Sequence, residues 1–156
     1  MGTSVNAKIA GLPETSFLAQ TTAKVMVTGD TIFTITGDIK ILSLYSRCVT
    51  VNNGTASTLQ YQVNPTAGTI TTITGASASL ASCAANSLVI LNGTALSTAP
   101  DLVVENVGLM NVSTRGILVP AGTIKTVIAV GSTTGTWQHF IEYTPLNVGA
   151  TVYSAF

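Results

Sequence analysis

Short apolar runs, in which hydrophobic and polar residues alternate, recur along most of the chain. The clearest pair is 117–130, which reads ILVPAGTIKTVIAV, and 136–143, which reads TWQHFIEY. Both are rich in residues that favour a pleated, half-buried surface, and the five residues GSTTG between them carry a glycine at each end. The pattern predicts a β-hairpin, which we take as the organising unit of an all-β domain.

The second strand of this hairpin has one face of particular interest. Strand side chains alternate between faces, so Trp137, His139, Ile141 and Tyr143 point the same way. Trp137, His139 and Tyr143 are our candidate residues for an interface or a ligand-binding face. The alternative is packing within the protein, because aromatic residues at strand spacing more often belong to a core or a subunit contact.

The rest of the chain continues the strand pattern. Gly-Asp turns at 29–30 and 37–38 and Asn-Asn-Gly at 52–54 separate the runs, since these residues favour tight reversals. Strict alternation over 39–51 places Tyr45 on the face of Ile39 and Ile41, and Ser46 on the opposite face. Besides the hairpin, the expected strands are 24–28, 31–36, 39–51, 58–63, 69–74, 88–91, 102–104 and 151–153.

These elements define the predicted architecture. About eight to ten short strands without a helical period indicate an antiparallel β-sandwich, jelly-roll-like in type. Residues 1–23 are interrupted by Gly2, Gly11 and Pro13, and we expect them to form an N-terminal arm. Residues 24–156 would then form the sandwich domain.

Composition excludes several classes of function. Charged residues make up only 8% of the chain, where about 25% is usual, and six basic residues cancel six acidic ones. No basic patch is available to neutralise phosphates, so we expect no nucleic-acid partner. A near-neutral surface also resists self-association poorly, which permits assembly.

The sequence predicts neither a membrane segment nor a secretion signal. No run approaches the roughly 18 apolar residues that a spanning helix needs, so no membrane partner is expected. There is no continuous apolar stretch before Pro13, and we therefore expect no cleaved signal peptide and synthesis in the cytoplasm.

Candidate chemistry is sparse. His139 is the only histidine, and the chain lacks a nucleophile motif such as G-x-S-x-G, so we predict no catalytic residues and no enzyme activity. Cys48 and Cys83 cannot complete a metal set with one histidine, and we expect no metal and no cofactor. The two cysteines leave two alternatives, a disulfide or two separate buried thiols, and a reducing compartment favours the second.

Three segments carry a resemblance to a known class of proteins. Residues 32–47 (IFTITGDIKILSLYSR), 117–124 (ILVPAGTI) and 135–150 (GTWQHFIEYTPLNVGA) together resemble capsid decoration (cement) and related accessory head proteins of tailed bacteriophages. The resemblance spans most of residues 28–153 and rests on strand-and-turn patterns. It implies a homotrimer that is made in the host cytoplasm, binds the major capsid protein on the outer surface of the head, and stabilises the virion through subunit contacts.

Other virion roles remain open from the sequence. The aromatic set of Trp137, Tyr143, Tyr45 and Tyr61 would suit a glycan-binding module of a phage fibre or tail if the rings were exposed together. A jelly-roll major capsid protein is a further alternative, but such a shell usually neutralises its genome with a basic arm, which this chain lacks.

Overall fold

The computed structural model describes residues 16–52, 56–91, 96–103 and 116–156. These residues form strands and no helix, and hence none that could span a membrane. The all-β class is confirmed, with more short strands than the sequence pattern predicts. The strands are β1 (Phe17–Gln20), β2 (Lys24–Val27), β3 (Thr31–Thr36), β4 (Ile39–Cys48), β5 (Leu59–Pro65), β6 (Thr71–Thr72), β7 (Leu88–Ile90), β8 (Asp101–Val103), β9 (Ile117–Val119), β10 (Gly122–Ile128), β11 (Ser132–Pro145) and β12 (Thr151–Ser154).

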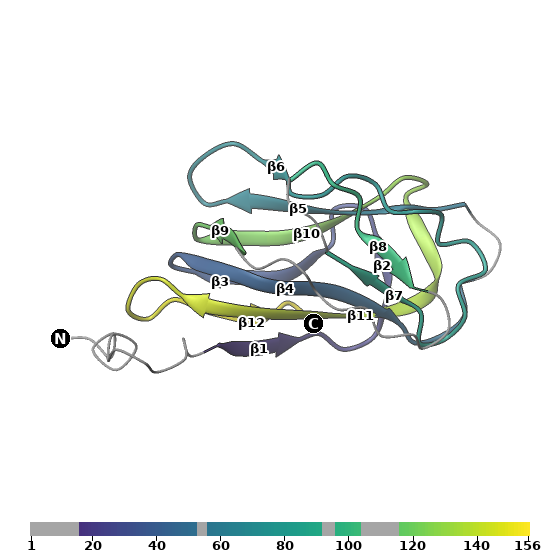
Figure 1. Ribbon diagram of the computed structural model, residues 1–156, viewed down its shortest axis with the longest axis horizontal. Coiled ribbons are helices and arrows are strands. Elements are labelled where there is room, and N and C mark those ends of the chain that lie inside the picture. The colour runs from purple at the N-terminus through teal and green to yellow at the C-terminus, as the bar shows by residue number, and fades with distance from the viewer. Residues whose placement is uncertain (1–15, 53–55, 92–95, 104–115) are drawn as a thin grey trace.

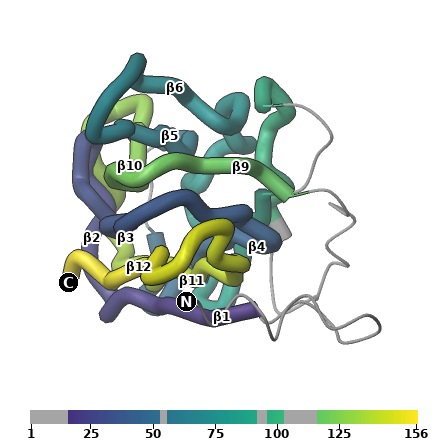
Figure 2. Tube along the Cα trace, turned by 90° about the vertical axis from the view of Figure 1, so that its left-hand side faces the viewer, coloured from purple at the N-terminus to yellow at the C-terminus, as the bar shows by residue number. Residues whose placement is uncertain are grey.

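The strands build two antiparallel sheets that pack face to face as a β-sandwich (Figure 1). The first sheet has the order β1-β11-β4-β7-β8, with β2 also paired to β11 and β9 to β4. The second sheet has the order β12-β3-β10-β5-β6. Figures 1 and 2 show β1 and β12 side by side at one margin of the sandwich and β6 at the opposite margin. The sandwich is thus established, whereas the jelly-roll connectivity stays a prediction.

The predicted hairpin is wrong. Strand β10 pairs with β3 and β5 in the second sheet, whereas β11 pairs with β1, β2 and β4 in the first. The turn between β2 and β3 instead donates backbone hydrogen bonds to β10 and to the loop that follows it. Thr28 N donates to Gly131 O at 2.8 Å, and Gly29 N donates to Thr126 O at 2.8 Å. The short glycine loop therefore carries the chain from one sheet to the other.

Strand β4 contains a bulge that reverses its alternation. Ile41 lies opposite Tyr143 and Ser43 lies opposite Glu142, so Leu42 is an extra residue in β4. Ile39 and Ile41 point inward before the bulge, and the buried residues after it are Leu44, Ser46 and Cys48. Strict alternation over this strand is therefore wrong beyond Leu42. The bulge turns Ser46 into the core and Tyr45 away from it.

The two Gly-Asp turns form as the sequence predicts. Gly29 and Gly37 have φ of +89° and +74°, in the left-handed region that residues with a Cβ avoid. Of the Asn-Asn-Gly signal, Asn52 is described, while residues 53–54 lie outside the described residues.

The segment predicted as an arm contributes a strand to the first sheet. β1 pairs antiparallel with β11, so that Phe17 lies opposite Tyr143 and Gln20 lies opposite Phe140. Residues 1–15 of the segment lie outside the described residues. The domain division at residue 23 therefore stays a prediction.

Candidate functional site

The three candidate residues of β11 share one face, and that face is buried between the sheets. Trp137 is 0% exposed, His139 1% and Tyr143 5%. Their common orientation follows from the alternation of β11, as the sequence predicts. Of the two interpretations that the sequence left open, burial fits packing within the protein, because the folded chain itself covers all three side chains.

His139 belongs to a chain of hydrogen bonds that crosses the core. Its Nδ1 lies 2.6 Å from Ser46 Oγ, on the residue directly opposite in β4. Ser46 Oγ lies 2.7 Å from the hydroxyl of Tyr61, which comes from β5 in the other sheet. All three residues are essentially without solvent contact. The chain His139–Ser46–Tyr61, which we call the core triad, therefore links the two sheets.

The segment between β1 and β2 and the end of the chain lie against His139. Thr21 N donates to His139 O at 3.0 Å, and His139 N donates to Thr21 Oγ1 at 3.0 Å. The ring of Phe156 meets the imidazole edge to face, with 6.3 Å between centroids, and Lys24 Nζ lies 5.0 Å from the centre of the Phe156 ring. These contacts hold the segment between β1 and β2 and the side chain of Phe156 against His139.

Burial keeps the core triad uncharged. It lowers the pKa of His139 from 6.5 to about 3, and the charge of Asp30 only partly opposes this effect. Burial also raises the pKa of Tyr61, although the hydrogen bond from Ser46 acts in the other direction. At neutral pH the imidazole, the hydroxyl and the phenol are all neutral, so the site holds no charge that would need a partner.

The core triad has one feature of a catalytic site and lacks the others. Ser46 Oγ and His139 Nδ1 lie at the separation expected of a nucleophile and its general base. A reacting substrate would have to reach Ser46, which is 0% exposed and has Tyr61 on its other side. What this arrangement can do is satisfy buried polar groups and fix the position of one sheet against the other.

Tyr143 and Trp137 have separate structural roles. The hydroxyl of Tyr143 accepts a hydrogen bond from Val152 N at 3.2 Å and lies 3.3 Å from Thr151 Oγ1, so it covers the edge of β12. The ring of Tyr143 stacks on that of Phe17 at 5.8 Å. The indole of Trp137 fills the core, and its Nε1 has no hydrogen-bond partner within the described structure.

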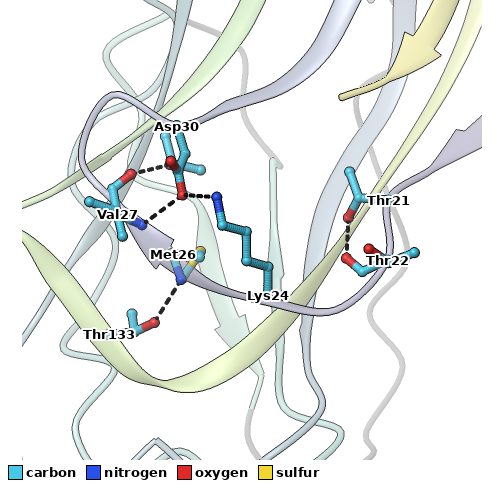
Figure 3. A network of polar contacts seen from close by, with 8 residues as sticks. Thr21, Thr22, Lys24, Met26, Val27, Asp30 and Thr133 are labelled. Carbon is cyan, nitrogen blue, oxygen red and sulfur yellow. Dashed lines mark hydrogen bonds and ion pairs between the residues drawn. The ribbon is translucent and has the colours of Figure 1, made fainter. Parts of the chain in front are cut away.

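A second polar cluster surrounds the turn between β2 and β3 (Figure 3). Asp30 Oδ2 accepts a hydrogen bond from Val27 N at 3.2 Å and forms an ion pair with Lys24 Nζ at 3.2 Å. Met26 N donates to Thr133 Oγ1 at 3.1 Å, which attaches β2 to the start of β11. These contacts stabilise the turn that carries the chain from β2 in the first sheet to β3 in the second. Their role is structural.

Asn52 is the most highly coordinated buried amide among the described residues. Its Oδ1 accepts hydrogen bonds from Thr134 N at 2.9 Å, Thr134 Oγ1 at 3.1 Å and Gly135 N at 3.0 Å, and its Nδ2 donates to Leu80 O at 2.6 Å. The side chain thus joins three segments that are distant in sequence. The sequence marks Asn52 only as part of a turn signal, and nothing in the pattern indicates this role.

The two cysteines are free thiols, both buried. Cys48 Sγ donates to Thr50 O at 3.1 Å and lies 3.8 Å from Cys83 O. Burial, with a smaller contribution from Cys83, raises the pKa of the Cys48 thiol to about 11. Of the two alternatives from the sequence, the structure has the separate buried thiols.

The aromatic set proposed for glycan binding is divided between the core and the outer face of the first sheet. Tyr61 and Trp137 are in the core, whereas Tyr45 lies on the outer face and stacks on Phe140 at 4.7 Å between centroids. Arg47 lies over the same Phe140 ring, 5.6 Å from its centre, and donates to Gln138 Oε1 at 2.7 Å. These rings therefore do not form one exposed platform.

The described residues bring together no group of three or more His, Cys, Asp or Glu side chains of the kind that holds a metal ion. Comparison of the chain with protein-family models, with curated proteins and with solved structures returned no match.

Proposed function

We propose that the protein is a structural component of a bacteriophage virion, a capsid decoration (cement) protein. It binds the major capsid protein on the outer surface of the head and stabilises the head through subunit contacts. Residues 32–47, 117–124 and 135–150 resemble capsid decoration proteins of tailed bacteriophages, and this resemblance supports the role and implies a homotrimer.

The observation that carries the proposal is the burial of the core triad. His139 is the one histidine of the chain, and its hydrogen bonds through Ser46 to Tyr61 join the two sheets. The surface offers few charges, together with exposed apolar side chains such as Leu118 on β9 and Val148 in the loop between β11 and β12. A protein built in this way acts through contact area more readily than through reactive groups.

Binding to phage heads tests the proposal. Purified protein is mixed with expanded heads that lack a decoration protein, and the heads are sedimented and then heated. We expect saturable binding at a fixed ratio to the major capsid protein, and heads that release their DNA at a higher temperature. Unexpanded heads serve as the control. Failure to bind expanded heads from the phage that encodes the chain would overturn the proposal.

The glycan-binding alternative loses the aromatic face on which it was based. Trp137 and Tyr61 are inaccessible in the folded protein, and Tyr45 points away from both. On this reasoning we expect no quenching of Trp137 fluorescence by sugars, and a clear, saturable response on a glycan array would revive the alternative.

A further inference from the structure

Strand β1 is an edge strand whose outward backbone groups can be identified. Within the described structure it pairs with β11 alone. Thr21 N donates to His139 O, which makes these two residues a hydrogen-bonded pair of the antiparallel ladder. This bonding pattern repeats every second residue, so the backbone N–H and C=O groups of Phe17 and Ala19 also point towards β11. The N–H and C=O groups of Leu18 and Gln20 therefore point away from β11, along the free edge.

The other edges of the sandwich are short or protected. On β12, the outward N–H of Val152 donates to the Tyr143 hydroxyl, and Phe156 O just beyond it accepts from Thr22 N at 3.1 Å. Strand β6 has two residues, β9 has three and is followed by Pro120, β8 carries Asp101, and β2 carries Lys24. Short length, charge and self-coverage are the usual devices that keep an edge from pairing with another chain.

Strand β1 has four residues, more than β6 or β8, and it lacks the charge that β2 carries. Its sequence, Phe-Leu-Ala-Gln, contains no charge and no proline, and its pairing with β11 runs without a register shift. Phe17 is 47% exposed and Leu18 is 65% exposed. An uncharged, regular edge strand with exposed apolar side chains is suited to the addition of another strand.

We infer that β1 pairs with β1 of a second copy of this chain, antiparallel across a two-fold axis at Ala19. In this register Leu18 lies opposite Gln20 of the second copy, and the outward N–H and C=O groups of both residues are exchanged. The strand is self-complementary, as an isologous contact requires. The chain has a net charge of zero, so two copies do not repel each other. The first sheets of the two copies then form one continuous sheet.

This inference does not depend on the virion role. In an assembly that is trimeric through other surfaces, the β1 contact links one trimer to the next. Heads could bind the protein without it, and the contact could form in solution without heads, so the two proposals fail separately.

Self-association and one pair of charge variants test the inference. Sedimentation equilibrium over the micromolar range should show pairwise association, of single chains or, where other surfaces already form a trimer, of trimers. Leu18→Lys places a charge at the edge and should weaken the association roughly tenfold or more. Leu118→Lys is the matched control, because Leu118 is 71% exposed on the same sheet but lies on β9, away from β1. It should leave the association unchanged.

A cross-linking variant tests the register. At the two-fold axis the two Ala19 residues form a non-hydrogen-bonded pair, in which Cα atoms lie about 4.5 Å apart, within the range of a disulfide. Ala19→Cys should therefore give a covalent dimer under mild oxidation, and Leu118→Cys should not. A chain that stays monomeric, association that Leu18→Lys leaves unchanged, or association without an Ala19→Cys cross-link would each overturn the inference.

Discussion

The hydroxyl of Tyr61 lies 2.7 Å from Ser46 Oγ, and this contact ties the second sheet to the first in the middle of the core. The same hydroxyl also lies 3.5 Å from Val89 O, at the outer limit of a hydrogen bond. Ser46 is therefore the main polar partner of the phenol. Through Ser46, the position of one sheet is linked to the imidazole of His139 on the other.

Replacing Tyr61 by Phe removes this tie and keeps the ring. We expect Tyr61→Phe to lower the free energy of unfolding by about 1–2 kcal/mol, because a buried hydrogen bond is lost while Ser46 keeps its contact with His139. Urea unfolding followed by Trp137 fluorescence measures the change. Tyr153→Phe is the control, since Tyr153 is exposed and should tolerate the change. Equal stability of the two variants would contradict the proposed role.

The stability of the protein should fall as the pH falls from 6.5 towards 3. His139 takes up a proton near pH 6.5 in the unfolded chain, whereas burial lowers its pKa to about 3 in the folded protein. Between these values the unfolded state binds more protons, so stability increases with pH, by roughly 1.4 kcal/mol per pH unit. Above pH 6.5 the imidazole is neutral in both states and its contribution is constant.

The variant His139→Gln isolates this contribution from that of the carboxyl groups. Urea unfolding of both proteins between pH 7 and 4 should give a shallower pH dependence for His139→Gln, whatever its stability at pH 7. The NMR signals of the single histidine should also show no protonation in the folded protein down to about pH 4. An imidazole that titrates near pH 6.5 in the folded protein would mean that His139 is accessible to water.

The sequence predicts strand positions well in this protein and strand partners poorly. Alternation is a local property, so the runs that become β3 and β12 can be read directly from it. A short glycine loop, in contrast, serves equally for a hairpin and for the crossing from β10 to β11. Which of these forms depends on the turn at Thr28, about a hundred residues earlier in the chain.

The core triad was beyond prediction for the same reason. Ser46 and His139 are 93 residues apart, and they meet only because β4 and β11 pair in one register. The bulge at Leu42 decides that Ser46 faces inward, and a bulge leaves no clear pattern of apolar and polar residues. His139 could be singled out as an unusual residue, but its partners could not.

Asn52 should be among the polar residues whose loss costs most. Asn52→Ala removes one donor and a carbonyl oxygen that accepts three hydrogen bonds. The buried N–H of Gly135 loses its bond to Asn52 Oδ1, whereas Leu80 O keeps the hydrogen bond from Cys83 N at 3.3 Å. We expect a loss of roughly 3 kcal/mol in the free energy of unfolding, measured by urea or thermal unfolding. Asn147→Ala is the matched control. Asn147 is exposed, so removing its contact with Asp38 N should cost less than about 1 kcal/mol. A smaller loss for Asn52→Ala than for Asn147→Ala would contradict this.

Gly131, between β10 and β11, and Gly135, near the start of β11, should respond differently to alanine. At Gly135 a Cβ would lie 2.4 Å from Thr50 O and 2.9 Å from the Cα of Asn52, which are backbone atoms that cannot turn aside. Gly135→Ala should therefore push apart the start of β11 and the Asn52 segment, and we expect a loss of roughly 2–3 kcal/mol in the free energy of unfolding.

At Gly131 the same substitution meets no atom within 4 Å, and only the backbone conformation opposes it, with φ at +89°. We expect Gly131→Ala to cost about 1 kcal/mol, the usual penalty for a Cβ in the left-handed region. Thermal unfolding of the two variants side by side separates steric contact from backbone strain. A larger loss of stability for Gly131→Ala than for Gly135→Ala would contradict the importance of the close packing between Gly135 and Asn52.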